Sequence, residues 1–240
     1  MLALVFHQCF TAGYHYPLNR LNFVLQILSS ILLVIYQAVT LGVNLSELSQ
    51  FSKNWPFMFP YIAYRLPRRD TWTLAQVVFF IILESLMALL AHANYIQFLM
   101  LIFPSKLERS LIFWMLGPMA LVQAGMFFAD FAKFNDFKTI DLADALVNIC
   151  DASLALLYTS GLLIWGGFVN WRRAWRTDGS TAAFGIAVLV VAVCKTVVSF
   201  VHIAYDRAYW IRLLSATFTN WQCWLGVLVV GVGGHGDWRV

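Results

Sequence analysis

The chain has 240 residues, of which 61% are hydrophobic and only 12% are charged, and its formal net charge is +4. This composition, with a mean hydropathy of +0.73, excludes an ordinary soluble domain. It indicates an integral membrane protein whose main partner is the lipid bilayer, and we expect no nucleic-acid partner.

Six apolar runs are each long enough to cross a bilayer. A helix rises about 1.5 Å per residue, so about 20 mostly apolar residues span the roughly 30 Å of hydrocarbon. In chain order the runs are Phe23 to Val43, Trp72 to Ile102, Ser110 to Phe131, Leu142 to Val169, Thr181 to Ala204 and Trp210 to Val232. The sequence therefore predicts an all-α, polytopic transmembrane helix bundle of six spans, forming a single membrane domain over residues 1–240.

The longest predicted loop is Asn44 to Thr71, which contains three prolines. Its segment Phe51 to Tyr64 is rich in aromatic residues, and Trp and Tyr settle at the membrane interface. We therefore expect this segment to lie at the interface, although a seventh crossing there stays open. The apolar start of the chain, Met1 to Phe10, lacks the basic residues and cleavage site of a secretory signal.

Basic loop residues alone do not decide the orientation in the membrane, because the two sides carry nearly equal numbers of them. Side A denotes the side of the termini and of the loops after the second and fourth spans, and side B the opposite side. A basic cluster, Arg172, Arg173 and Arg176, borders side A and is a candidate for binding anionic lipid headgroups. A glycosylation sequon at Asn44 lies on side B. Both features favour cytosolic termini.

Five spans are each interrupted by a polar residue at a similar depth. Counted from side B by helix rise, these residues lie about 12 to 18 Å deep. Because polar groups in hydrocarbon need protein or water as partners, we expect them to face one another. The layer consists of Glu84, Gln123, Asp151, Lys195 and Asn220.

Helical spacing adds secondary candidates to this layer. Asn148 and Tyr158 share a helix face with Asp151, while Ser199 and His202 share one with Lys195. We expect Lys195 to point into the bundle and to pair with Asp151 or Glu84. If Asp151 neutralises Lys195, Glu84 remains as a carboxyl group whose ionised form is poorly solvated unless water or a cation reaches it. Glu84 is therefore a candidate for holding a proton near neutral pH.

Two classes of function fit such a layer. In the first, Glu84, Asp151 and Lys195 form a proton- or ion-responsive site of a transporter or channel, with a proton or a small ion as partner. In the alternative, the layer is structural, since polar side chains also join helices in many membrane bundles. The protein would then be a non-catalytic membrane-complex subunit or a receptor-like bundle with a membrane-protein partner.

Other chemistries find less support in the sequence. A retinal Schiff base attaches on the last of seven helices, whereas Lys195 lies on the fifth of six predicted spans. His92 and His202 are separated by about 25 Å in depth by helix rise, too far for the two axial ligands of one haem. No cysteine or histidine motif predicts a metal site. We therefore predict no cofactor and no catalytic residue, although an intramembrane enzyme using Glu84 or Asp151 stays open.

Two segments resemble parts of uncharacterised multi-pass membrane proteins of fungi. They are LAHANYIQFLMLIFPSKLERSLIFWMLGP, Leu90 to Pro118, and WRRAWRTDGSTAAFG, Trp171 to Gly185. The resemblance implies a eukaryotic membrane, either an endomembrane or the vacuole. It implies no function for individual residues.

Overall fold

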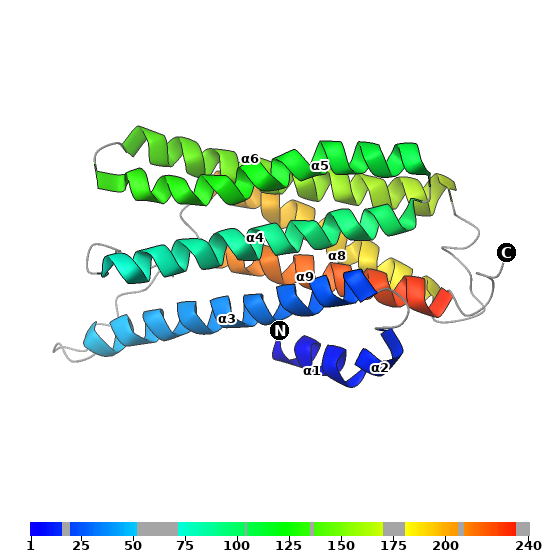
Figure 1. Cartoon of the computed structure of the whole chain (residues 1–240), viewed down its shortest axis with the longest axis horizontal. Helices are drawn as coiled ribbons and strands as arrows, with labels where there is room; N and C mark the ends of the chain where they lie inside the picture. Colours follow the sequence, from blue (N-terminus) through cyan, green and yellow to red (C-terminus); the bar gives the residue numbers. More distant parts are fainter. Residues whose placement is uncertain are drawn as a thin grey trace.

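Six long helices run side by side along the longest dimension of the computed structural model (Figure 1). The structure describes residues 1–15, 20–51, 72–103, 105–134, 137–169, 181–205 and 209–233, and this part of the chain contains no strand. The fold is therefore the predicted all-α helical bundle.

The helices have the following bounds in chain order. Two short helices, α1 and α2, come first, and two of the long helices continue into a 3₁₀ segment, η2, and a π-helical segment, η3. They are α1 Leu2–Phe10, α2 Ala12–His15, α3 Arg20–Phe51, α4 Leu74–Ile102, α5 Lys106–Met126, η2 Phe127–Phe134, α6 Phe137–Ile164, η3 Trp165–Val169, α8 Thr181–Ala204 and α9 Tyr209–Gly233.

Five of these helical segments are long and apolar enough to cross a membrane, judged by length and composition among the described residues. They lie in α3, α4, α5 with the start of η2, α6 with most of η3, and α8. The sixth long helix, α9, is not among the five. It contacts α8, α4 and α3, so much of its surface faces protein.

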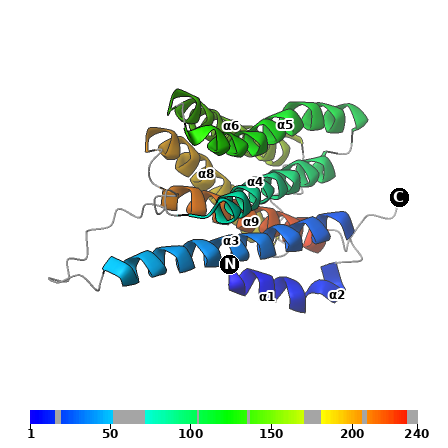
Figure 2. The same cartoon turned by 60° about the vertical axis from the view of Figure 1, so that its left-hand side comes forward.

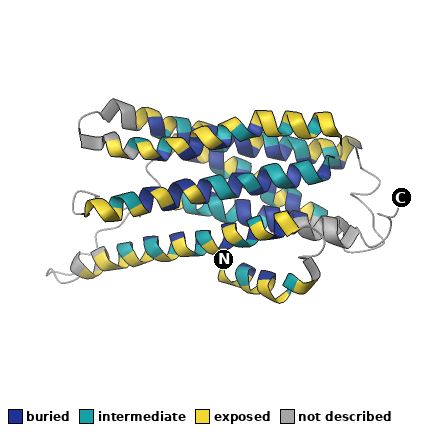
Figure 3. Ribbon diagram, in the orientation of Figure 1, coloured by how far each residue is buried: buried dark blue, intermediate teal, exposed yellow. Residues whose placement is uncertain are grey.

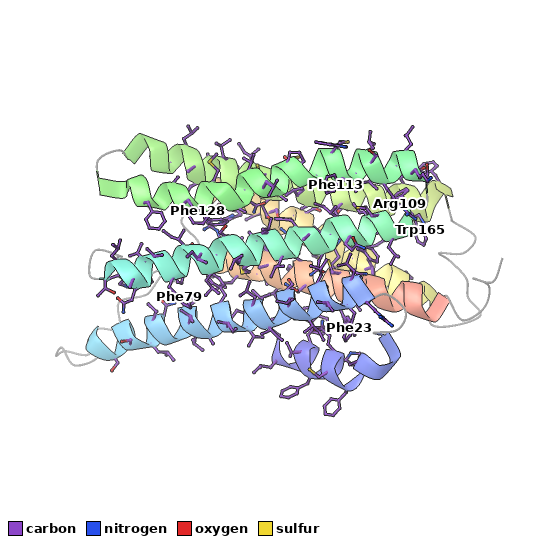
Figure 4. The ribbon with its side chains drawn as sticks, in the orientation of Figure 1. Phe23, Phe79, Arg109, Phe113, Phe128 and Trp165 are labelled. Atoms are coloured by element: carbon purple, nitrogen blue, oxygen red, sulfur yellow. The ribbon has the colours of Figure 1, made fainter. Side chains whose placement is uncertain are left out.

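The distribution of polar and apolar side chains is the reverse of that in a soluble protein. Large apolar side chains such as Phe79, Phe113 and Phe128 are exposed on the outside of the bundle (Figure 4). Buried positions concentrate between the helices (Figure 3) and include Glu84 and Lys195. This arrangement suits a bilayer, where hydrocarbon contacts the outer surface and polar groups need partners inside the protein. The chain is thus built as a multi-pass integral membrane protein.

The first predicted span and the loop after it need correction. Helix α3 is not confined to residues 23–43 but extends from Arg20 to Phe51. Asn44 is therefore helical, and its side-chain amide donates to the carbonyl oxygen of Thr40 at 2.7 Å. Because an acceptor sequon requires an accessible loop, Asn44 no longer supports the proposed orientation.

Several predicted features lie outside the described residues. They include most of the interfacial segment, from residue 52 onward, the seventh crossing that would have to lie there, and the basic cluster Arg172, Arg173 and Arg176. The interfacial position, the lipid-headgroup contact and the single-domain organisation remain predictions.

The start of the chain forms a helix that the sequence did not predict. In both views, α1 and α2 lie beside α3 (Figure 2). Leu4 of α1 packs with Phe23 and Trp224 in a buried cluster, and Gln8 donates to the hydroxyl of Ser30 at 3.1 Å. With nine residues, α1 is too short to cross the hydrocarbon. It instead covers one side of α3.

The entry of α4 is fixed by local chemistry. Thr73 accepts a hydrogen bond from the backbone amide of Gln76, whose side-chain oxygen in turn accepts from the amide of Thr73. This capping box satisfies two amides that the first helical turn leaves without partners. It sets the start of the helix that carries Glu84 and His92.

Candidate functional site

The centre of the bundle contains an ion pair between α6 and α8. The Lys195 ammonium lies 3.0 Å from Oδ1 and 2.7 Å from Oδ2 of Asp151. The Lys195 side chain is only 1% exposed, whereas that of Asp151 is 18% exposed. Lys195 therefore points into the bundle, as predicted, and of the two predicted partners, Asp151 and Glu84, it pairs with Asp151.

Two serine hydroxyls complete the surroundings of this pair. Ser199, one helical turn after Lys195, and Ser215 of α9 accept from the ammonium at 2.7 and 2.5 Å. Both hydroxyls donate to Oδ2 of Asp151, at 2.8 and 3.2 Å. The pair and the two hydroxyls thus join α6, α8 and α9, and nearly all of their polar atoms have hydrogen-bond partners.

His92 of α4 lies near the same carboxylate. Its Nε2 lies 3.8 Å from Oδ1 of Asp151, slightly beyond hydrogen-bonding distance. The prediction that His92 and His202 are separated by about 25 Å in depth is wrong, because both line one cavity. The predicted depths were counted from the ends of the apolar runs, as if all helices began and ended at the same depth. In the structure the helix ends are offset along the bundle (Figure 1).

The cavity lies beside Asp151 and measures about 40 Å³ as the space open to the centre of a water molecule. About 10 to 15 Å³ on this measure holds one water, so the cavity has room for roughly three. Segments α4, α5, η2, α6, α8 and α9 surround it, and its polar lining residues are His92, Gln123, Asn148, Asp151, His202, Arg212, Ser215 and Thr219.

Three of these lining residues have a buried polar atom without a hydrogen-bond partner in the described part of the chain. The atoms are Nδ1 of His92, Oε1 of Gln123 and Oδ1 of Asn148. Buried polar atoms are nearly always satisfied in native proteins, by protein, by ordered water or by a ligand. Their presence around one cavity therefore marks it as a polar site.

Glu84 belongs to a second cluster, nearer to side B. Its Oε1 accepts from the hydroxyl of Tyr36 at 2.8 Å and lies 3.9 Å from Nη1 of Arg212. Nη2 of Arg212 lies 3.9 Å from Asp144, whose side chain is 48% exposed. A cation therefore lies near Glu84, and its candidacy for holding a proton stays a prediction. Arg212, which the sequence analysis did not include in the polar layer, provides the positive charge.

Asn220 does not face the other members of the predicted layer. Its side-chain oxygen accepts from Ser29 at 2.9 Å, and its backbone carbonyl accepts from Gln26 at 3.0 Å. Both partners lie on α3. Of the five predicted layer residues, Asp151 and Gln123 line the cavity, Lys195 lies behind Asp151, and Glu84 and Asn220 make separate contacts with α3.

The secondary candidates also divide between two places. Asn148 and His202 line the cavity, and Ser199 binds the ion pair. Tyr158 instead stacks on Tyr95, with ring centroids 4.1 Å apart, in a buried apolar cluster toward side A. This aromatic layer lies next to the site without forming part of it.

The residues that sequence reasoning missed have a recognisable spacing. Arg212, Ser215 and Thr219 recur at intervals of three and four on α9, so they share one helix face. All three line the cavity. Counting depth along this helix selected only Asn220. The polar face formed by Arg212, Ser215 and Thr219 was therefore not predicted.

The donor set of the site is unlike that of a transition-metal centre. Within the described ranges, no group of three or more His, Cys, Asp or Glu residues is arranged to hold a metal ion. The polar groups around the cavity include carboxylate, amide and hydroxyl oxygens, which suit protons, water and hard cations. Nitrogens of His92, His202 and Arg212 also line it.

No protein-family model matches the chain, and neither does any curated protein or any solved structure. The resemblance to fungal membrane proteins therefore stays an expectation based on two segments.

Proposed function

We propose that the protein is a proton- or ion-coupled membrane transporter or channel, with Asp151 and Lys195 as its coupling pair. The observation that supports this function best is the position of Asp151. Its carboxylate is bound to a buried ammonium on one side and borders a polar cavity at the centre of the bundle on the other.

The pair can respond to a change in charge because the charged form of each side chain is stabilised by the other. An unpaired charge in a low-dielectric interior is strongly unfavourable. A proton or cation that reaches Asp151 from the cavity competes with Lys195 for the carboxylate. Loss of the pair would loosen the contact among α6, α8 and α9, which gives binding a mechanical consequence.

The test is proton flux in liposomes that contain the purified protein, driven by a pH gradient and reported by an entrapped pH-sensitive dye. We expect wild-type flux above that of empty liposomes and loss of most of it in Asp151→Asn. Ser29→Ala is the matched control, because Ser29 is a buried polar residue on α3 outside the cavity. Wild-type flux equal to that of empty liposomes, with small cations present, would falsify the proposal.

A second candidate function is that of a non-catalytic membrane-complex subunit. The polar contacts between α3 and α9 favour it, because they join helices without lining the cavity. They include Asn220 with Ser29, and Gln37 with Thr217 at 3.0 Å. Purification in mild detergent from native membranes distinguishes this function: a single uncomplexed species would argue against an obligate subunit.

We also propose an endomembrane or vacuolar location with cytosolic termini. The resemblance to fungal proteins and the basic residues of Trp171 to Arg176 support it, and an acidic lumen would supply the proton gradient. A fluorescent protein fused to the C-terminus should label internal membranes and be digested by protease added to intact organelles. Plasma-membrane labelling, or protection from protease, would reject this location or orientation.

A further inference from the structure

Several acceptor atoms line the cavity beside Asp151. Oε1 of Gln123 and Oδ1 of Asn148 are buried and have no hydrogen-bond partner within the described residues, and both residues line the cavity. From this donor set we propose that the cavity binds one alkali cation, held by oxygens of Gln123, Asn148 and Asp151. This inference rests on the proposed function, because it names the ion that the same site would bind.

The two oxygens of Asp151 are used unequally. Oδ2 accepts from Lys195, Ser199 and Ser215, whereas Oδ1 accepts from Lys195 alone. A carboxylate oxygen has about two lone-pair positions, so Oδ1 has spare capacity. Because Asp151 lines the cavity and its side chain is 18% exposed inside the bundle, a cation can reach this carboxylate without first breaking the ion pair.

The other ligands come from residues that fixed helices position. Asn148 lies one turn before Asp151 on α6, so the two side chains share a helix face. Gln123 projects from α5 across the same cavity. Hydroxyls of Ser215 and Thr219 line the α9 side. Hard cations select carboxylate, carbonyl and water oxygens, and space for roughly three waters also fits one alkali cation that keeps a water ligand.

The charges at the cavity are arranged in two ion pairs. Asp151, which lines the cavity, is paired with Lys195, and Arg212, which also lines it, lies 3.9 Å from Glu84. Because each pair is neutral, a monovalent ion adds less uncompensated positive charge to this site than a divalent ion does.

Binding of the ion has a consequence for Lys195. A cation on Oδ1 weakens the attraction between the carboxylate and the ammonium, because the two positive charges compete for one negative charge. Protonation of His92, whose Nε2 lies 3.8 Å from Oδ1, would place a positive charge at the same position. Proton and alkali cation should therefore exclude each other, which is the relation that exchange requires.

The test measures thermal unfolding of the purified full-length protein in detergent. NaCl and KCl are compared with N-methyl-D-glucamine chloride at equal ionic strength, since the organic cation is too large for the cavity. Binding to the folded state raises the free energy of unfolding by RT ln(1 + [L]/Kd), and Tm rises with it. We expect Tm to rise with the concentration of Na⁺ or K⁺ and to stay constant with the organic cation.

Variants locate the effect within the protein. Gln123→Leu and Asn148→Leu should lose the dependence of Tm on the alkali cation. Gln123→Glu, which adds a carboxylate to the cavity, should show it at about ten-fold lower concentration, equivalent to about 1.4 kcal/mol. Asn94→Leu is the control: Asn94 is a buried amide on α4 whose oxygen also has no partner within the described residues, but it does not line the cavity.

The outcomes separate this inference from the proposed function. Equal Tm in all three salts, or an alkali dependence that survives in both leucine variants, overturns the cation site. If proton flux is present in that case, the proposed function stands without an alkali cation. Conversely, cation-dependent Tm in a protein without flux supports the site and rejects the proposed function.

Discussion

At the scale of single residues, Lys195 shows how an ammonium group is accommodated among apolar helices. It has three donor hydrogens, and its partners are Asp151, Ser199 and Ser215. A buried charge is destabilising unless it is paired and hydrogen-bonded. The sequence predicted a pairing with Asp151 or Glu84 from depth along the helices, and it did not predict the contact with Ser215.

This geometry predicts a large difference between single and double substitutions. Lys195→Met should destabilise the fold by about 3–5 kcal/mol, because it leaves the Asp151 carboxylate buried without its cation. Adding Asp151→Asn removes that charge, and most of the loss should be recovered. The measurement is Tm in detergent. A double variant less stable than Lys195→Met would contradict the pairing as the source of the loss.

At the scale of helices, periodicity predicted which faces point inward but not how far each helix extends. The stripe of Asn148 and Asp151 on α6 was correct, since both line the cavity. The depth of His92 and His202 was wrong, because it was counted from the ends of apolar runs. Helix ends depend on tertiary packing: α3 continues to Phe51, well beyond its apolar run. A hydropathy pattern contains no information about such offsets.

The contact between α4 and α9 depends on a residue without a side chain. An added Cβ at Gly226 would approach the ring of Phe98 more closely than van der Waals contact allows, with a second ring carbon only 2.6 Å away. Phe98 is buried, so the ring has little room to move. Gly226 therefore permits the close approach of these helices.

We expect Gly226→Ala to lower stability by about 1–3 kcal/mol through overpacking. Gly117→Ala is the control on α5, where a Cβ would meet nothing within 4 Å. It should be neutral or slightly stabilising, since Ala favours a helix over Gly. Thermal unfolding of the two variants side by side checks this. An equal Tm for both would show that Phe98 can move aside without loss.

At the scale of the whole molecule, composition was sufficient to predict a membrane bundle. Exposed apolar residues cover its outside, and polar residues are buried between the helices (Figure 3). The site was only partly predictable. Asp151, Lys195 and Gln123 lie at or beside the cavity, but Arg212, near the start of the sixth predicted span, was not included in the polar layer. Its role depends on Glu84 and Asp144, which only the fold brings near.

Proton flux through the double variant Lys195→Met/Asp151→Asn tests most directly whether the ion pair is functional or only structural. The double variant should fold, with a Tm close to that of the wild type, because no unpaired charge remains at this position. We expect its flux in liposomes, at matched protein density, to equal that of empty liposomes. Wild-type flux from this variant would contradict a coupling role and leave the pair as a structural link among α6, α8 and α9.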